Sequence, residues 1–156
     1  MKLDHDLVRC VLLAIEESED INGISENELL DYLKKYGNYD NRNNIAYTVS
    51  KLKEASFITG DVRWASNSPT WIMAGNLTYE GHKFLDNIRD DKVWRDTKKI
   101  LSKFSSVSLS LVSSVASNVI SQLIQKQLGL NWKIKIKDNM DNKFRKLFEG
   151  INRIWK

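Results

Sequence analysis

The spacing of apolar residues changes once within the first 74 residues, from the three- and four-residue steps of helices to the two-residue step of strands. Helical spacing covers residues 7–17, 26–36 and 43–56, and short polar segments separate the three stretches. Ser25 and Glu28 have the spacing of a capping box, which marks the beginning of the second helix. Each of the three short helices has one apolar face, so the helices must pack against one another. This order restricts the chain to compact three-helix arrangements that a small sheet completes.

Two short strands are predicted directly after the third helix, over residues 57–64 and 70–74. The small and polar residues 65–69 between them predict a loop, and Pro69 favours the edge of that loop over a central strand. Three helices followed by a two-stranded wing is the order of a winged helix-turn-helix domain. We therefore expect a mainly α fold with a small β-wing, and we place the winged-helix domain over residues 1–90.

The chain beyond the wing predicts three more helices, over residues 79–89, 92–104 and 105–128. The last two lie in a predicted helical extension over residues 91–129. Thr78 and an aspartate at position 90 or 91 are suitable N-terminal caps for the first two of these helices. Gly129 is a suitable C-terminal cap for the third.

Positive charge is concentrated in the C-terminal tail, residues 130–156. The whole chain has a formal net charge of +4, yet residues 1–129 carry 16 Lys and Arg against 17 Asp and Glu, a net of −1. The tail carries 8 Lys and Arg against 3 Asp and Glu, a net of +5. Within it, residues 132–137 alternate like a strand and residues 142–155 return to helical spacing. A basic tail with interleaved aromatic residues can bind nucleic acid or an acidic partner surface.

The composition predicts a cytoplasmic protein. Cys10 is the only cysteine, lies in an apolar run and cannot form an internal disulfide, which favours a reducing compartment and a structural thiol. No signal peptide is recognisable at the N-terminus. Ser, Asn and Gln interrupt residues 105–128 throughout, which argues against a membrane-spanning helix.

Residues 77–98 read LTYEGHKFLDNIRDDKVWRDTK, and this segment resembles the hallmark of a family of small bacterial and phage-encoded proteins of unknown function. The N-terminal MKLDHDLVRCVLLAIEE and the LKEASFITG at residues 52–60 are similar to other parts of that family. The resemblance covers about residues 1–100 and leaves residues 130–156 unmatched. It implies a winged-helix fold and a phage or mobile-element origin. It brings no activity and no catalytic residues.

In a winged-helix domain the third helix is the natural reader of the DNA major groove. Its predicted solvent face and the wing combine amide, hydroxyl and cationic side chains, which pair with base edges and phosphates. The predicted nucleic-acid-binding residues are Arg42, Asn43, Asn44, Tyr47, Ser50, Lys51, Arg63 and Trp64. Glu54 borders this face. The slightly negative charge of residues 1–129 weakens the interpretation, because duplex binders neutralise several phosphates. The alternative is a winged-helix module that binds protein.

Acidic residues near His82 raise the question of a metal or acid–base site. His82, Asp86 and Arg89 share one helix face, but the chain lacks the HxxxH, HExxH and CxxC patterns of metal sites. Asp90 and Asp91 are accounted for as helix caps. We therefore expect His82 to be a structural residue that bonds across a helix-packing seam, and we expect no metal, no cofactor and no enzymatic activity.

The apolar, serine-rich helix over residues 105–128 is too hydrophobic to be solvated along its whole length. It is predicted either to form a homodimer or to pack back onto the winged-helix domain, and association with a membrane is the least favoured reading. The predicted self-association residues are Leu111, Val112, Val115, Val119 and Leu123.

Together these patterns predict a non-enzymatic winged-helix regulator or adaptor that contacts double-stranded DNA through the third helix and the wing. The alternative is a protein-interaction module without DNA binding, such as an inhibitor or accessory subunit in phage–host conflict. A membrane-active effector that uses residues 105–156 is the third reading.

Overall fold

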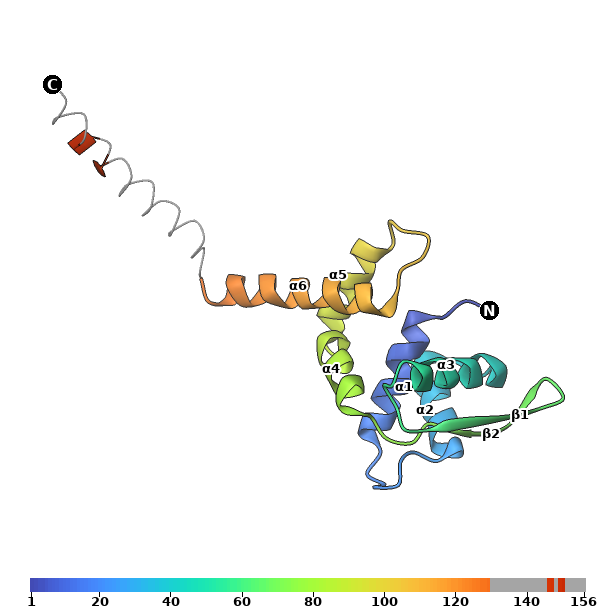
Figure 1. The fold of residues 1–156 in the computed structure, drawn as a ribbon. Coiled ribbons are helices and arrows are strands. Elements are labelled where there is room, and N and C mark those ends of the chain that lie inside the picture. Colours follow the sequence, from blue (N-terminus) through green and yellow to red (C-terminus); the bar gives the residue numbers. More distant parts are fainter. Residues whose placement is uncertain (130–145, 148, 151–156) are drawn as a thin grey trace. The chain divides into compact units, whose positions relative to one another are not determined.

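A computed structural model describes residues 1–129, 146–147 and 149–150 of the chain. The chain divides into two compact units, Met1–Ser117 and Asn118–Lys156. The named elements in the described residues are α1 (His5–Glu17), α2 (Glu26–Gly37), α3 (Arg42–Glu54), β1 (Asp61–Ala65), β2 (Ser68–Met73), α4 (Tyr79–Ile88), α5 (Asp91–Leu101) and α6 (Leu109–Gln127), as Figure 1 shows.

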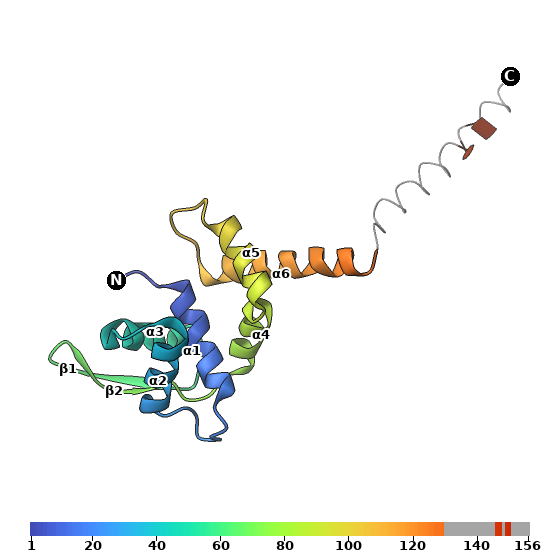
Figure 2. The ribbon, with the colours of Figure 1, turned by 180° about the vertical axis from the view of Figure 1, so that it is seen from behind.

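Helix α1 is the centre of the first unit. It contacts α2, α3 and α4, and it lies between α3 and α4 in both Figure 1 and Figure 2. Contacts on several sides explain why its apolar stripe is wide. Its buried side chains are Leu7, Val8, Val11, Leu12, Ala14 and Ile15. Other fully buried side chains of the core are Leu29 and Leu33 of α2, Ile45, Val49 and Leu52 of α3, and Ile72 of β2.

The helix boundaries follow from side chains that satisfy the free backbone groups at each end. Asp4 accepts from the backbone N–H groups of Asp6 and Leu7 and begins α1. The predicted capping box is confirmed: the Ser25 N–H donates to Glu28 Oε2 at 3.0 Å, and the Glu28 N–H donates to Ser25 Oγ at 3.3 Å.

The two strands form an antiparallel hairpin that is tighter than the sequence predicts. Residues Ser66 and Asn67 alone make the turn, with φ of 50° and 61°, and Ala65 pairs with Ser68. The loop expected over residues 65–69 is therefore wrong. Positive φ at both central residues is what a two-residue type I′ turn requires, and such turns match the twist of their strands. Pro69 lies within β2 beside an irregularity in the pairing, where its missing N–H is tolerated.

The observed first strand begins at Asp61, four residues later than the predicted beginning at residue 57. Ile58 forms only an isolated bridge to Leu77. Gly60 sits directly against β2, because a Cβ there would lie 1.9 Å from the Met73 carbonyl oxygen. The backbone of residues 57–60 thus closes the base of the hairpin.

Helices α5 and α6 are shorter than predicted. Asp90 caps α5 as expected, but α5 ends at Leu101 rather than at residue 104, and α6 begins at Leu109 rather than at residue 105. The hydroxyl of Ser108 accepts the Leu111 N–H at 3.2 Å, which explains the later beginning of α6. The predictions for residues 132–137 and most of 142–155 lie outside the described residues. Among the described helices, none combines the length and the hydrophobicity that crossing a membrane requires.

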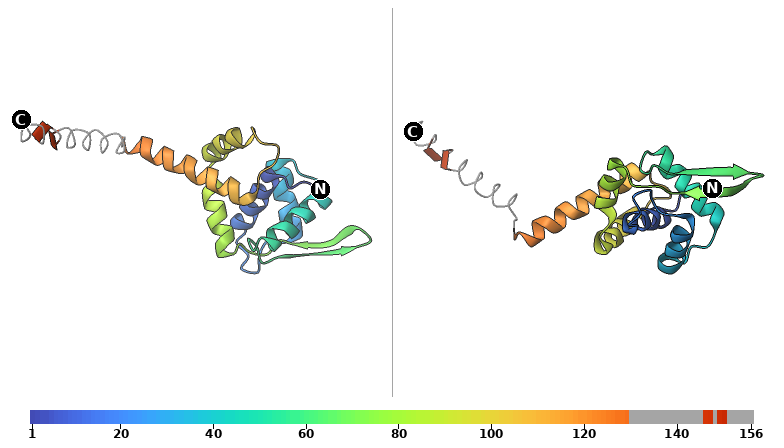
Figure 3. Two further views of the ribbon diagram at one scale, coloured as in Figure 1. Left: turned by 45° about the horizontal axis from the view of Figure 1, so that its top comes forward. Right: turned by 90° about the horizontal axis from the view of Figure 1, so that it is seen from below.

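The described residues are thus mainly helical with one two-stranded antiparallel sheet. Three helices followed by a hairpin that contacts α3 is an order compatible with a winged-helix-like fold. The views in Figure 3 show the hairpin projecting past the end of α3.

Candidate nucleic-acid interface

Helix α3 divides cleanly into a buried face and a solvent face. The buried side chains are Ile45, Ala46, Thr48, Val49 and Leu52. On the opposite face Asn43 and Asn44 are exposed, and Tyr47, Ser50 and Lys51 are partly exposed. The Asn41 side chain accepts the Asn44 backbone N–H at 3.1 Å and begins the helix. The cap uses only the backbone N–H of Asn44, and the side-chain amides of Asn43 and Asn44 remain exposed at the first turn.

Arg42 does not lie free on this face but braces the hairpin. Its Nε and Nη2 donate to Glu26 Oε1 at 2.8 and 2.5 Å, and its Nη1 donates to the Pro69 carbonyl. The second oxygen of Glu26 accepts the Ile72 N–H at 3.0 Å. The pair therefore joins the first turns of α2 and α3 to β2. Arg42, predicted as a DNA contact, binds Glu26 and the Pro69 carbonyl in this structure.

The lysines of α3 are paired with carboxylates. Lys51 Nζ lies 2.9 Å from Glu54 Oε1, and Lys53 Nζ lies 3.1 Å from Asp61 Oδ1. The hydrogen bond to Glu54 raises the pKa of Lys51, and the hydrogen bond from Lys53 lowers the pKa of Asp61. Exposed pairs of this kind contribute little to stability, so an incoming phosphate can compete for the lysines. Glu54 and Asp61 nevertheless reduce the positive potential of this face.

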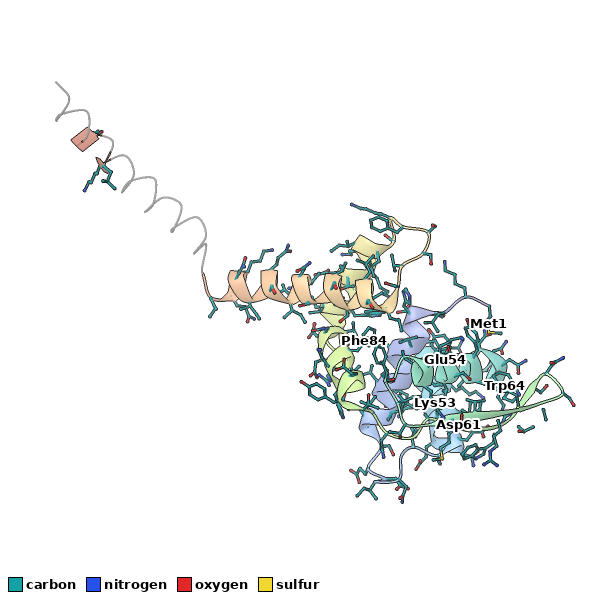
Figure 4. All side chains as sticks on the ribbon, viewed as in Figure 1. Met1, Lys53, Glu54, Asp61, Trp64 and Phe84 are labelled. Atoms are coloured by element: carbon teal, nitrogen blue, oxygen red, sulfur yellow. The ribbon has the colours of Figure 1, made fainter. Side chains whose placement is uncertain are left out.

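Arg63 and Trp64, the two predicted contacts on the hairpin, lie on opposite faces of it. Successive strand residues alternate in direction. Arg63 is paired with Trp71, and its guanidinium carbon lies 5.2 Å from the centroid of the Trp71 ring. Trp64, labelled in Figure 4, is paired with Pro69, whose carbonyl Arg42 binds. Trp64 is 48% exposed. Only Trp64 of the two therefore shares a surface with α3.

The outer face of the hairpin was missed by sequence reasoning. Trp71 and Met73 alternate with the buried Ile72 and remain 38% and 37% exposed, and Arg63 lies against Trp71. The alternation of residues 71–73 was the available signal, but it does not reveal which face the helices cover.

Several residues of the segment over residues 77–98 hold the fold together. Thr78 caps α4, and Gly81 lies so close to Phe57 that a Cβ there would be 2.0 Å from the Phe57 carbonyl oxygen. The rings of Phe57 and Phe84 stack with centroids 4.8 Å apart. The prediction that His82 bonds across a packing seam is wrong, because its side chain is exposed.

Charged residues close the junction between α4 and α5. Arg89 donates to Glu16 at 2.5 and 3.0 Å and to Asp86 at 2.8 Å. Arg9, which sequence reasoning missed, donates to the Ile88 carbonyl at 2.7 Å and so satisfies the end of α4. No group of three or more potential metal ligands occurs within the residues that the structure describes. The side chains at this junction therefore hold the helices together.

The predicted self-association residues differ in burial. Leu111 is 44% exposed, Val115 and Leu123 are partly exposed, and Val119 is buried. Val112 is fully buried within the first unit, where Asn87 Nδ2 also donates to Ser113 Oγ at 2.9 Å. The first turns of α6 thus pack onto their own chain, and Val112 is not part of any surface that a second copy can reach.

The structure defines a mainly helical protein with a hairpin bound to α3, a helix with one solvent-exposed face. Residues 2–108 match the family described as hypothetical protein (DUF2513), and the chain belongs to this family. It is similar to an uncharacterized protein of Haemophilus influenzae, with 32% identity over 125 residues that cover 80% of this chain and 99% of the relative. No solved structure matches the chain. The resemblance to a family of unknown function is confirmed, and the functional argument must come from the site.

Proposed function

We propose that this chain is a non-enzymatic winged-helix regulator or adaptor that contacts duplex DNA through α3 and the β1–β2 hairpin. The observation that carries the proposal is the first turn of α3, where Asn43 and Asn44 are exposed beside a hairpin that Arg42 holds in place. Asparagine side chains pair with the major-groove edge of adenine.

The dimensions of this surface suit a duplex. The 13 residues of α3 correspond to a length of about 20 Å, and the major groove is wide enough to admit an α-helix. The hairpin projects past α3, so with the helix in the groove its polar turn, Ser66 and Asn67, reaches the flanking backbone. The Arg42–Glu26 pair supports this geometry because it fixes the hairpin relative to the first turn of α3.

A second candidate function is protein binding, which the outer face of the hairpin favours. Arg63, Trp71 and Met73 form a small exposed cluster of the residue types that are enriched at protein interfaces. This cluster is on the face opposite Trp64, so the two functions are separable by mutation. Trp71→Ser with Met73→Ser is expected to abolish binding to a protein partner and to leave DNA binding unchanged.

The DNA proposal is tested with the full chain and a fluorescein-labelled duplex of random sequence. Fluorescence anisotropy at low salt is expected to show binding that weakens steeply as salt is added. Lys51→Glu on the solvent face of α3 should weaken this binding about tenfold or more. Lys34→Glu, the same charge change at an exposed position of α2, is the matched control and should change binding by less than threefold. Absence of wild-type binding to any duplex at low salt would overturn the proposal.

A further inference from the structure

A row of exposed cations runs along one side of α5, whereas the lysines of α3 are paired with carboxylates. Lys92, Arg95 and Lys99 follow one another at steps of three and four residues, which keeps them on one side of the helix, and the exposed Lys103 lies in the turn after it. We call these four residues the α5 cation stripe. Its part within α5, from Lys92 to Lys99, spans about 10 Å along the helix axis at 1.5 Å per residue.

The pairing of these cations differs from that of most cations elsewhere in the unit. Arg9, Arg42, Lys51, Lys53 and Arg89 each lie within 3.1 Å of a carboxylate oxygen. Among the described residues, by contrast, no salt bridge joins Lys92, Arg95 or Lys103 to a carboxylate, and Lys99 lies 3.9 Å from Asp96. The opposite side of α5 packs against the rest of the first unit and holds the helix in place. Val93, Trp94, Thr97 and Leu101 are buried, and Trp94 Nε1 donates to Asp6 at 2.7 Å.

The end of the stripe lies near the solvent face of α3. Tyr47 of α3 donates to the Met1 carbonyl at 3.2 Å, and Lys2 donates to the Ser105 carbonyl at 2.7 Å. Ser105 is two residues from Lys103. Figures 1 and 2 show the N-terminal segment between α3 and the loop that follows α5. The two surfaces are therefore separated by one short stretch of chain.

We infer that the α5 cation stripe binds the phosphate backbone of the duplex and supplies the neutralising charge that α3 lacks. This inference rests on the proposed function and deepens it. A duplex carries one negative charge for each 1.7 Å of its axis, so a row of exposed cations is complementary to it. The carboxylates beside Lys51 and Lys53 limit what α3 and the hairpin contribute. In this division α3 reads bases, and α5 provides affinity that is independent of sequence.

The test compares two triple variants of the full chain by anisotropy against a random-sequence duplex over a range of salt concentrations. The stripe variant is Lys92→Gln, Arg95→Gln and Lys103→Gln. The matched control is Lys34→Gln, Lys35→Gln and Lys126→Gln, which removes the same charge at exposed positions off the stripe. The stripe variant is expected to bind at least tenfold more weakly at low salt and to lower the salt slope by about 2–3, because each lost phosphate contact removes about 0.9. The control should stay within threefold of wild type with an unchanged slope.

Each other outcome has a definite meaning. Equal losses in both variants would show a general effect of net charge and would overturn the inference while leaving the DNA proposal in place. If the wild type binds no duplex, both fail. If the stripe variant weakens binding and Lys51→Glu does not, the stripe is supported and α3 is not the contact surface. Binding of the wild type to vesicles of anionic lipid in preference to the duplex would also overturn the inference in favour of a membrane surface. Circular dichroism confirms that both triple variants keep their helical content.

Discussion

Single residues in this chain acquire their roles from neighbours that are distant in sequence. Arg42 follows the Asn41 cap and is expected to be exposed from helical phase alone, yet it binds Glu26 and the Pro69 carbonyl. Gly81 is one of ten residues of α4, yet it is the point at which α4 contacts the Phe57 backbone. Sequence spacing reveals the face of a helix on which a residue lies. It does not reveal which backbone approaches that face.

The Arg42–Glu26 pair is expected to act as one unit. Arg42→Gln and Glu26→Gln should each lower the free energy of unfolding, and the double variant should lose less than the sum, with a coupling of about 1 kcal/mol. The reason is that either change alone leaves the remaining charged side chain without its ion-pair partner. Urea denaturation of the four proteins measures the coupling. Strictly additive losses would show that the pair does not hold the hairpin.

Gly81→Ala is expected to destabilise the protein by about 1–3 kcal/mol, because the added Cβ clashes with the backbone of Phe57. The usual effect of this change inside a helix has the opposite sign, a gain of about 1 kcal/mol. Lys83→Ala, at an exposed position of the same helix, is the control and should change stability by less than about 0.5 kcal/mol. A Gly81→Ala protein as stable as wild type in urea would contradict the packing of α4 on residue 57.

At the scale of elements, much of the fold could be predicted because its signals are local. Caps, apolar periodicity and the change of period locate α1 to α5 and the hairpin within a few residues. The sequence predicts a longer loop than the two-residue turn because neither turn residue, Ser66 or Asn67, is a glycine, although asparagine tolerates positive φ. The opposite directions of Arg63 and Trp64 follow from strand alternation. Which hairpin face α3 covers could not be read from sequence, because it depends on packing between elements.

The turn predicts a stabilising substitution. Ser66→Asn with Asn67→Gly gives the residue pair that type I′ turns prefer, and it should raise the free energy of unfolding by roughly 1 kcal/mol by relieving positive φ at residue 67. Ser68→Gly, one residue later within β2, should instead lower it. Both are measured by the midpoint of urea denaturation. An Asn-Gly turn that lowers the midpoint would mean that the hairpin does not close at Ser66 and Asn67.

At the scale of the whole molecule, a net charge does not show which cations are free to bind a phosphate. Counting charges over residues 1–129 gave a net of −1 and argued against a DNA-binding surface. A sum over the chain cannot distinguish paired from unpaired cations. The structure shows that cations of α3 are paired, whereas among the described residues no salt bridge joins Lys92, Arg95 or Lys103 to a carboxylate. The same limit applies to α6, where helical phase placed the buried Val112 and the exposed Leu111 in one predicted surface.

We propose that the exposed side of the first turns of α6 mediates homodimerisation, since Leu111 is 44% exposed. Light scattering on the full chain should report a dimer, and Leu111→Glu should convert it to a monomer by placing a charge in an apolar interface. Ser110→Glu, a change at the adjacent exposed position, is the control and should remain dimeric. A wild-type chain that is monomeric at micromolar concentration would contradict this prediction.

The central claim, that the first half of α3 reads duplex DNA, is tested most directly by selection from a library of randomised duplexes. The wild-type chain is expected to enrich a defined sequence motif. Asn43→Ala with Asn44→Ala should lose that enrichment while retaining salt-dependent binding to unselected duplex, because phosphate contacts do not depend on these amides. Asn27→Ala, an exposed asparagine of α2, should enrich the wild-type motif. Enrichment of the same motif by the Asn43/Asn44 double variant, or no enrichment by the wild type, would contradict the claim.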